Sequence, residues 1–231
     1  MVKRSALLPV LLAMGLCVSG CQHSRAEEAK AATGPTTIAL PAPEFKSKVT
    51  VEDALAKRRS VRSYSTEPIT LQQVSLLLWA AQGITEPTRG LRTAPSAAAT
   101  YPLRVYLFAG NVKDLPAGVY RYVPKGHKLE SVLDGDQRSN VGSQPQMVTA
   151  PVVIAYIADY TDTAARFGAS KARAWADIEA GHSAQNFLLA EVALGLVGVP
   201  MGGFDAAKIK STLKLTDNEE AIYVVSAGNK G

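Results

Sequence analysis

A run of seven apolar residues, from Val152 to Ala158, constrains the fold of this chain more than any other stretch. Pro151 stands before the run and Asp159 follows it, so its length suits a strand better than a helix. Because the run shows no alternation with polar residues, both of its faces should be buried. The sequence therefore predicts a central strand that is covered by further elements on both sides.

The segment from Ala184 to about Leu196 is apolar nearly all round and is predicted to be the buried helix of the fold. It contains Gln185, Asn186 and Glu191, which argue against a membrane span. Further strands are predicted at 103–109, 119–123, 128–133 and 222–226, and further helices at 51–57, 71–81, 137–148, 161–167, 171–196 and 206–213. Since strands and helices do not alternate strictly, the predicted class is α+β.

Three helix starts carry capping residues. Thr50 precedes the helix at 51–57, Thr70 with Gln73 forms a capping box before 71–81, and Asp205 precedes 206–213. Residues 85–100 contain Pro87, Gly90 and Pro95, so this stretch is predicted to be a loop.

The first twenty residues resemble a bacterial lipoprotein signal. Lys3 and Arg4 precede an apolar run that is too short for a comfortable membrane span, and the run ends in Val18-Ser19-Gly20-Cys21. We expect residues 1–20 to be removed and Cys21 to carry a lipid, which places the protein at the bacterial cell envelope, lipid-anchored and facing the periplasm. An ordinary cleavable signal or an uncleaved anchor are the alternatives.

Residues 21–44 are rich in Ala, Thr, Pro and charge and are predicted to be a flexible tether, so that the folded domain spans 45–231. The formal charge of +5 falls to about +3 when Lys3 and Arg4 leave, which is too mild to indicate nucleic acid. Cys17 leaves with the signal, and with Cys21 lipidated no cysteine remains for a disulfide, a nucleophile or a metal.

Cations gather in the stretch Arg58-Arg59-Ser60-Val61-Arg62. Guanidinium groups bind phosphate through two parallel N–H bonds, and an extended backbone would put Arg58, Ser60 and Arg62 on one side. The pattern favours a phosphorylated ligand. A simpler interpretation is that the cations complement the dipole of the preceding helix.

Two further polar segments could contact such a ligand. Residues 95–102, Pro-Ser-Ala-Ala-Ala-Thr-Tyr-Pro, have small side chains that would let a flat ring approach, and Ser96 could donate a hydrogen bond. Residues 200–204, Pro-Met-Gly-Gly-Phe, expose backbone N–H groups at Gly202 and Gly203. Each segment could equally be a plain loop or turn.

Side chains for acid–base, nucleophilic or metal chemistry are scarce in this sequence. It contains no H-E-x-x-H, C-x-x-C, G-x-S-x-G or strand-linked G-x-G-x-x-G pattern. His182 falls at the start of the apolar helix, where a structural role is the more common one. No catalytic side chain and no metal ligand is therefore predicted, and the three polar segments together indicate a planar, phosphorylated cofactor.

In this order and spacing, the three segments resemble the FMN-dependent nitroreductase superfamily, over about residues 51–228. Arg58-Arg59-Ser60-x-Arg62 is similar to its opening R-x-S-x-[KR] motif, and Gln185-Asn186-Phe187-Leu188-Leu189-Ala190 resembles its central helix. The resemblance implies an α+β fold with a central mixed or antiparallel sheet, flanking helices and a long buried central helix. Thr93-Ala94-Pro95-Ser96-Ala97 and Gly118-Val119-Tyr120-x-Tyr122 are most similar to the SagB-type, azoline-dehydrogenase-like branch.

The resemblance also implies a homodimer with two FMN sites at its interface. By this resemblance, Arg58 and Ser60 would hold the ribityl phosphate region of FMN, and Arg62 would lie by the pyrimidine edge of the ring. The backbone N–H of Gly202 would meet flavin N5. The partner subunit would contribute its Pro95–Ser96 loop to the same flavin. The cofactor-binding residues implied in this way are Arg58, Arg59, Ser60, Arg62, Pro95, Ser96, Ala97, Ala99, Met201, Gly202, Gly203 and, near the end of the chain, Lys230.

The implied activity is ping-pong electron transfer through flavin N5 to a small-molecule acceptor, with NADH or NADPH as a donor. The chain departs from the family by ending at Gly231, where relatives continue into an arm that wraps the other subunit. A lipid anchor is also uncommon for a flavoenzyme. These departures keep open an alternative, namely an envelope lipoprotein that retains the fold and binds a ligand or flavin without redox turnover.

Overall fold

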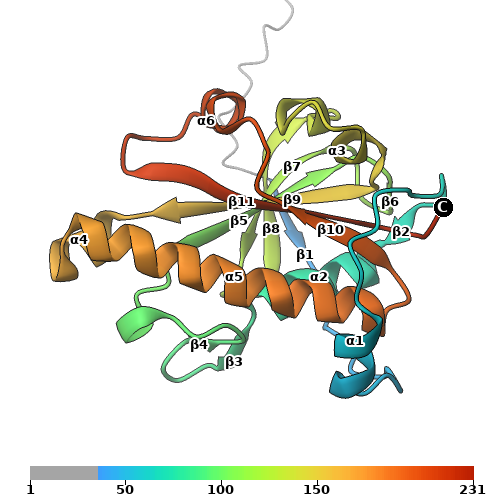
Figure 1. Cartoon of the computed structure of the whole chain (residues 1–231), viewed down its shortest axis with the longest axis horizontal. Helices are drawn as coiled ribbons and strands as arrows, with labels where there is room; N and C mark the ends of the chain where they lie inside the picture. Colours follow the sequence, from blue (N-terminus) through green and yellow to red (C-terminus); the bar gives the residue numbers. More distant parts are fainter. Residues whose placement is uncertain (1–35) are drawn as a thin grey trace, which may run out of the picture. The chain divides into compact units, whose positions relative to one another are not determined.

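The computed structural model of this chain describes residues 36–231. In this part, seven strands form one sheet in the order β1-β8-β7-β5-β9-β11-β10, and every neighbouring pair is antiparallel (Figure 1). In sheet order the strands are β1 (Thr37–Ala39), β8 (Lys128–Asp134), β7 (Gly118–Val123), β5 (Leu103–Ala109), β9 (Val152–Asp159), β11 (Glu219–Gly228) and β10 (Val197–Met201). The predicted central strand is therefore confirmed as β9, with β5 on one side and β11 on the other.

Helices cover both faces of this sheet. They are α1 (Val51–Lys57), α2 (Leu71–Gln82), α3 (Pro145–Thr149), α4 (Thr161–Phe167), α5 (Ala169–Ala193) and α6 (Ala206–Leu213). Two small pairs of strands lie apart from the sheet, β2 (Ile69–Thr70) with β6 (Val112–Lys113), and β3 (Ile84–Glu86) with β4 (Leu91–Arg92).

The alternation of side chains along β9 divides the core into two layers. Ile154 and Tyr156 point to the face covered by α2 and α5, whereas Val153 and Ile157 point to the face covered by α3 and α6. All four are fully buried. Figure 1 shows the same division, with α5 on one side of the sheet and α6 and α3 on the other. The predicted α+β class, with a long central helix, is confirmed.

The caps predicted from the sequence form as expected. The side chain of Thr50 accepts a hydrogen bond from Asp53 N, Thr70 and Gln73 form a complete capping box, and Asp205 accepts from Lys208 N. These contacts satisfy N–H groups that a helix leaves unpaired in its first turn, so the starts of α1, α2 and α6 follow from local chemistry.

The long helix α5 begins after Gly168, whose φ of 87° favours glycine, and it spans 25 residues. Its inner face packs against the sheet and α2 through residues such as Phe187 and Ala184. The opposite face carries Ile178, which is 57% exposed. The helix is thus buried along one side, while the other side of its N-terminal half stays open.

The predicted tether was wrong at its C-terminal end. Residues 37–39 form β1 at the edge of the sheet, pairing with β8 from Thr37↔Glu130 to Ala39↔Lys128. Leu40 enters the core, and Ser75 Oγ donates to the carbonyl of Pro41 at 2.5 Å. A composition rich in Thr, Ala and Pro concealed a strand of only three residues. The folded part therefore begins before residue 45.

Two further predictions of secondary structure were wrong in part. The helix predicted at 137–148 is only a short 3-10 turn at Arg138–Asn140 followed by α3, because Gly142 and Pro145 interrupt it. The loop predicted at 85–100 contains the antiparallel pair β3 and β4 and the 3-10 turn Ala97–Ala99.

Within residues 36–231 no helix is both long and apolar enough to cross a membrane. The predicted signal at 1–20, the lipidated Cys21 and the greater part of the tether lie outside the described residues.

Candidate functional site

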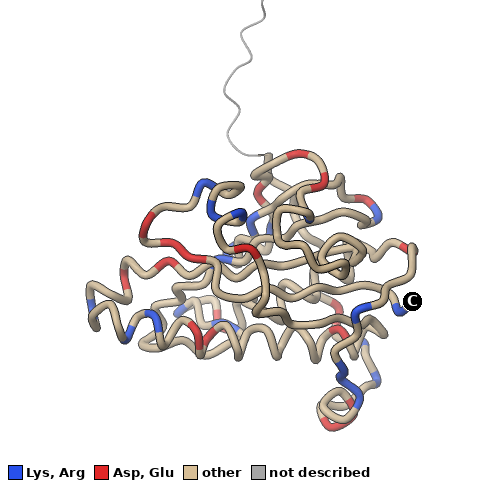
Figure 2. The backbone as a smooth tube through the Cα atoms, turned by 45° about the horizontal axis from the view of Figure 1, so that its top comes forward, with Lys and Arg blue, Asp and Glu red and all other residues tan. Residues whose placement is uncertain are grey.

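The cationic segment after α1 is fixed beside the edge strand β10 and the end of the chain. Ser60 forms a parallel bridge with Gly198, and Val61 N donates to Gly198 O at 2.9 Å. Farther along, Ser65 N donates to Asn229 O at 3.0 Å. Figure 2 shows Lys and Arg positions gathered along this segment and near the C-terminus. The last residues of the chain therefore lie beside the arginines.

A hollow of about 290 Å³ opens between this segment and the C-terminal end of α5. Its cationic residues are Lys57, Arg58, Arg59 and Lys230. Lys57 is paired with Asp53 at 3.0 Å, and Arg59 donates to main-chain oxygens at Ala56 and Arg58.

Three cations of this region are free to bind an anion. Within residues 36–231, the side chains of Arg58, Arg62 and Lys230 make no ion pair and no hydrogen bond. Arg62 and Lys230 are exposed, and Arg58 is half-buried. The arrangement suits a ligand that carries a phosphate, since charge-assisted bonds from guanidinium and ammonium groups are the strong ones.

Glu191 lines the same hollow from α5 and is almost completely buried, at 2% exposure. Its Oε1 has no hydrogen-bond partner within the described residues. Burial raises the pKa of this carboxyl well above its usual range, and the charge of Arg58 acts in the opposite direction. A buried carboxyl therefore forms part of a cation-lined wall.

Gly198 is required where β10 passes this carboxyl. A Cβ at residue 198 would lie 2.3 Å from Oε1 of Glu191 and 2.0 Å from the backbone oxygen of Ser226. The close approach of strand and helix is therefore possible only with glycine.

Tyr64 anchors the cationic segment to the sheet. Its hydroxyl lies 2.7 Å from Ser226 Oγ, and its ring packs against Gly228. Burial raises the pKa of Tyr64 to about 12, so the phenol stays neutral at physiological pH. The arginines thus project from a segment that is tied down on both sides, at Ser60–Val61 and at Tyr64–Ser65.

The segment Met201–Gly203 lies where β10 ends, four residues and about 13 Å from the strand's start beside the hollow. Met201 is buried, whereas Gly202 and Gly203 are exposed, and no atom lies within 4 Å of where a Cβ on Gly202 would be. The carbonyl of Gly203 accepts from Gln144 Nε2 at 2.5 Å. The backbone at Gly202 is therefore open to a ligand that extends along β10.

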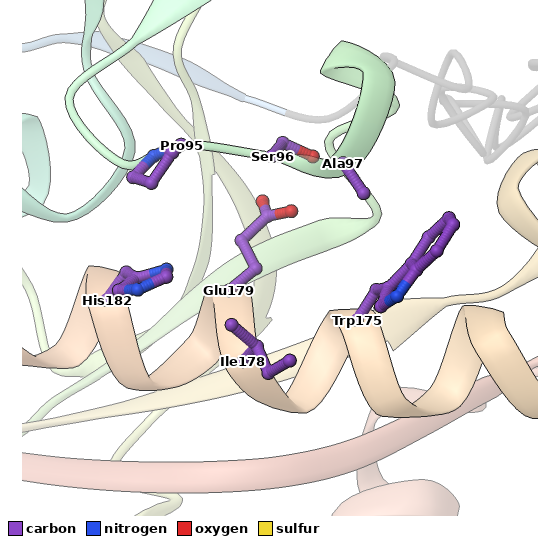
Figure 3. Close-up of a pocket in the computed structure, with 7 residues that line it drawn as sticks. All are labelled: Pro95, Ser96, Ala97, Trp175, Ile178, Glu179 and His182. Carbon is purple, nitrogen blue, oxygen red and sulfur yellow. The ribbon is translucent and has the colours of Figure 1, made fainter.

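The Pro95–Ala99 segment lies elsewhere, over the N-terminal half of α5 (Figure 3). There it borders a second hollow of about 270 Å³, lined by Pro95, Ser96, Ala97, Trp175, Ile178, Glu179 and His182. Glu179 lines this second hollow and Glu191 lines the first. The two residues are twelve positions apart on α5, which corresponds to about 18 Å along the helix axis. One chain therefore does not bring Ser96 next to the arginines.

Sequence reasoning missed two carboxyls and misplaced a histidine. Glu179 and Glu191 are the buried acids of α5, one in each hollow. Glu191 stands in the segment predicted to be the buried helix, which was a signal of its burial, whereas Glu179 lies outside that segment and carries no such signal. His182 lies in the middle of α5, is exposed, and makes no hydrogen bond within residues 36–231. The structural role expected for His182 was therefore wrong, because it lies on the open side of the helix. No group of three metal-ligating His, Cys, Asp or Glu side chains occurs among the described residues.

Comparisons with known proteins identify the family of this chain. The model of the nitroreductase family matches residues 55–229. A protein from Methanocaldococcus jannaschii that bears the name nitroreductase is 35% identical over 198 residues, covering 84% of this chain and 98% of its own length. The chain belongs to the nitroreductase family.

Solved structures of the family support the assignment. A nitroreductase homologue from Ralstonia eutropha superposes with a TM-score of 0.76 at 30% identity, covering 84% of this chain and 90% of its own. A second homologue, from Anabaena variabilis, gives a TM-score of 0.73 at 25% identity and covers 85% of this chain and 42% of its own. Family membership makes the chain a flavin-dependent oxidoreductase.

The residues present fit a flavin nucleotide. Free cations stand beside the start of β10, an unpartnered carboxyl oxygen lies behind them, and an open glycine backbone follows at the strand's far end. The phosphate of a flavin nucleotide needs cations, and its flat ring needs polar backbone groups some distance away.

Proposed function

We propose that this chain is an FMN-dependent oxidoreductase that works as a homodimer with a flavin site at each end of a shared interface. The observation that carries the proposal is that one chain holds the predicted cofactor-binding residues in two separate places. Arg58 and Gly202 lie near opposite ends of β10, while Ser96 lines the hollow at Glu179, which is about 18 Å along α5 from Glu191 in the hollow beside Arg58. A second copy would supply the missing half of each site.

Residues along β10 would hold one side of FMN. Arg58, Ser60 and Lys230 would bind the phosphate, with Arg59 beside them. Arg62 would lie at the pyrimidine edge, where a cation favours added negative charge. The backbone of Met201, Gly202 and Gly203 would contact the ring, with the Gly202 N–H directed at N5.

The partner subunit would hold the other side. Its segment with Pro95, Ser96, Ala97 and Ala99 has only small side chains, so the ring could approach the backbone closely. Bound FMN would supply hydride transfer at N5 in two half-reactions, with NADH or NADPH as donor and a small molecule as acceptor. The chain's own side chains would bind and orient the partners and exclude water.

The open face of α5 supports the homodimer. Ile178 is 57% exposed there, and Val51 and Leu55 on α1 are 66% and 54% exposed. Apolar side chains of this size on two helices, next to an incomplete site, are what a covering second subunit would bury.

The branch of the family and the cellular location of the protein are part of the same proposal. The loop at 93–97 and the strand at 118–122 favour the SagB-type, azoline-dehydrogenase-like branch. The pattern ending at Cys21 favours a lipid-anchored protein of the bacterial envelope, held at the membrane by this anchor alone.

A spectrum followed by reduction tests the proposal. The purified full-length protein should be yellow or should bind added FMN, and NADH or NADPH should bleach the flavin band without oxygen. A yellow protein that neither nicotinamide bleaches would instead support an enzyme with another donor or a non-redox flavin carrier. A colourless protein that takes up no FMN would overturn the cofactor assignment and favour the non-flavin binding protein.

A further inference from the structure

The segment from Pro95 to Tyr101 has an unusual backbone. Ala98, Ala99 and Tyr101 have φ values of 49°, 53° and 48°, although none is glycine. A left-handed conformation of this kind is unfavourable for a non-glycine residue. Such strain persists only where the surrounding structure imposes it. Contacts outside the backbone of the segment must therefore hold it in place.

A chain of hydrogen bonds provides these contacts. Tyr101 N donates to Ser96 Oγ at 2.8 Å, and the Tyr101 hydroxyl accepts from Arg92 N at 3.1 Å. The guanidinium of Arg92 lies 4.4 Å from the centre of the Tyr101 ring and donates to Gln82 Oε1 at 3.0 Å. Gln82 Nε2 in turn donates to Glu179 Oε1 at 3.3 Å. The segment is thus tied through α2 to α5.

Glu179, at the far end of this chain of hydrogen bonds, faces Ser96 across the hollow, so that the contacts form an open ring. Its carboxyl rises from α5 toward Ser96, between Trp175 and His182 (Figure 3). The side chain is 2% exposed. Burial raises the pKa of Glu179, and hydrogen bonding by Ser96 and Gln82 and the charge of Arg92 act in the opposite direction. Because the Ser96 oxygen accepts from Tyr101 N, the hydroxyl proton is free to point toward the carboxyl.

We propose that Glu179 is the positioning residue for the Pro95–Tyr101 segment. Through Gln82, Arg92 and Tyr101 it holds Ser96 in the orientation that meets the flavin of a second copy. This inference rests on the proposed function for its consequence, since a displaced Ser96 would weaken binding of FMN. The ring of contacts itself is independent of any ligand.

Four variants separate positioning from simple loss of stability. Glu179→Leu and Gln82→Leu each remove one link, and Glu179→Gln keeps a polar group of the same shape. Ser183→Ala is the matched control, because Ser183 is also buried on α5 and its hydroxyl donates to Ala81 O of α2 at 2.7 Å without joining the ring.

Hydrogen exchange on the cofactor-free protein gives the first readout. We expect Glu179→Leu and Gln82→Leu to speed exchange at residues 95–101 at least tenfold. Ser183→Ala should leave this segment unchanged and lower only overall stability. Equal exchange of the segment in wild type and Glu179→Leu would overturn the inference, whether or not the protein binds FMN.

Titration with FMN gives the second readout. The dissociation constant should rise about tenfold in Glu179→Leu, about tenfold in Gln82→Leu, and no further in the double variant, because both break one ring. Glu179→Gln should restore most of the affinity. Additive losses, or a loss in Ser183→Ala as large as that in Glu179→Leu, would contradict a positioning role. Absence of FMN binding in the wild type would instead count against the proposed function.

Discussion

The unpaired cations are the residues on which flavin binding depends. Nine other Lys and Arg side chains of the described part form ion pairs, as Arg104 does with Glu219 and Asp159. Arg58, Arg62 and Lys230 have no such partner within residues 36–231 and lie around one end of β10. Free cations at one place indicate an anionic ligand, whereas paired ones indicate only a solvated surface.

Arg62→Ala should weaken FMN binding about 10- to 100-fold, the loss of one hydrogen bond from a charged donor. The turnover rate of the variant should fall as well. Fluorescence titration of FMN measures the effect. Arg89→Ala is the control, because Arg89 is an exposed arginine that pairs with Glu86 away from the hollow. Unchanged affinity and rate in Arg62→Ala would remove Arg62 from the site.

Glu191 should make stability depend on pH. Its folded-state pKa lies above the ordinary glutamate value of 4.5, so its stabilising contribution is complete below that value and is lost as pH rises through the folded pKa. The ionisable groups around it are Lys57, Arg58, Arg59, Tyr64, Tyr156 and Lys230. Ionisation at higher pH places a charge where Oε1 has no partner.

Glu191→Gln removes this titration. Relative to wild type, the melting temperature of the variant should rise as the pH increases above the ordinary glutamate pKa of 4.5, by roughly 2–4 °C for each kcal/mol in a domain of this size. Thermal unfolding at several pH values provides the measurement. Parallel curves for the two proteins would show that Glu191 stays ionised throughout.

Among the elements, those with strong local signals could be predicted from the sequence, and those fixed by distant partners could not. The capped helices α1, α2 and α6 and the apolar strand β9 were correct, since a cap or a hydrophobic run acts within a few residues. The edge strand β1 was missed because its three residues form a strand only by pairing with β8, about ninety residues away.

The same distinction applies to the candidate site. The R-x-S-x-R pattern and the Gly-Gly turn are contiguous in sequence, so their contribution could be recognised there. Glu179, Gln82 and Arg92 converge from α5, α2 and β4, and no local pattern links them. Which face of α5 stays open depends on the packing of α2 and the sheet, and for that reason the exposure of His182 was not foreseen.

Removal of residues 36–44 tests the corrected start of the folded part. A chain that begins at residue 45 loses β1, the buried side chain of Leu40 and the hydrogen bond from Gln72 Nε2 to Ala42 O at 2.8 Å. Burial of one leucine alone contributes about 2–3 kcal/mol, so the melting temperature should fall by several degrees compared with a chain that begins at residue 36. Equal melting temperatures would show that this stretch belongs to the tether after all.

For the whole molecule, the separation of the two groups of cofactor-binding residues links dimer formation to FMN binding. The arginines and Gly202 lie near opposite ends of β10, Ser96 lies over the N-terminal half of α5, and the face of α5 that carries Ile178 is open. If two copies pair through that face, each completes the other's site. A chain that cannot pair should therefore also fail to retain FMN.

Ile178→Asp tests this coupling. A charge on the open face of α5 should shift the protein from dimer to monomer in analytical ultracentrifugation and lower FMN affinity at least tenfold. Val148→Asp is the control, since Val148 is 42% exposed on α3, on the opposite side of the sheet. A monomeric Ile178→Asp protein that binds FMN as tightly as wild type would separate assembly from the site.

A crystal structure of the protein with FMN tests the central claim most directly. We expect two copies, with the phosphate of each FMN within hydrogen-bond distance of Arg58 and Lys230 of one subunit. The ring should lie between Gly202 of that subunit and Ser96 of the partner subunit. A flavin bound wholly within one chain, or bound away from these arginines, would contradict it.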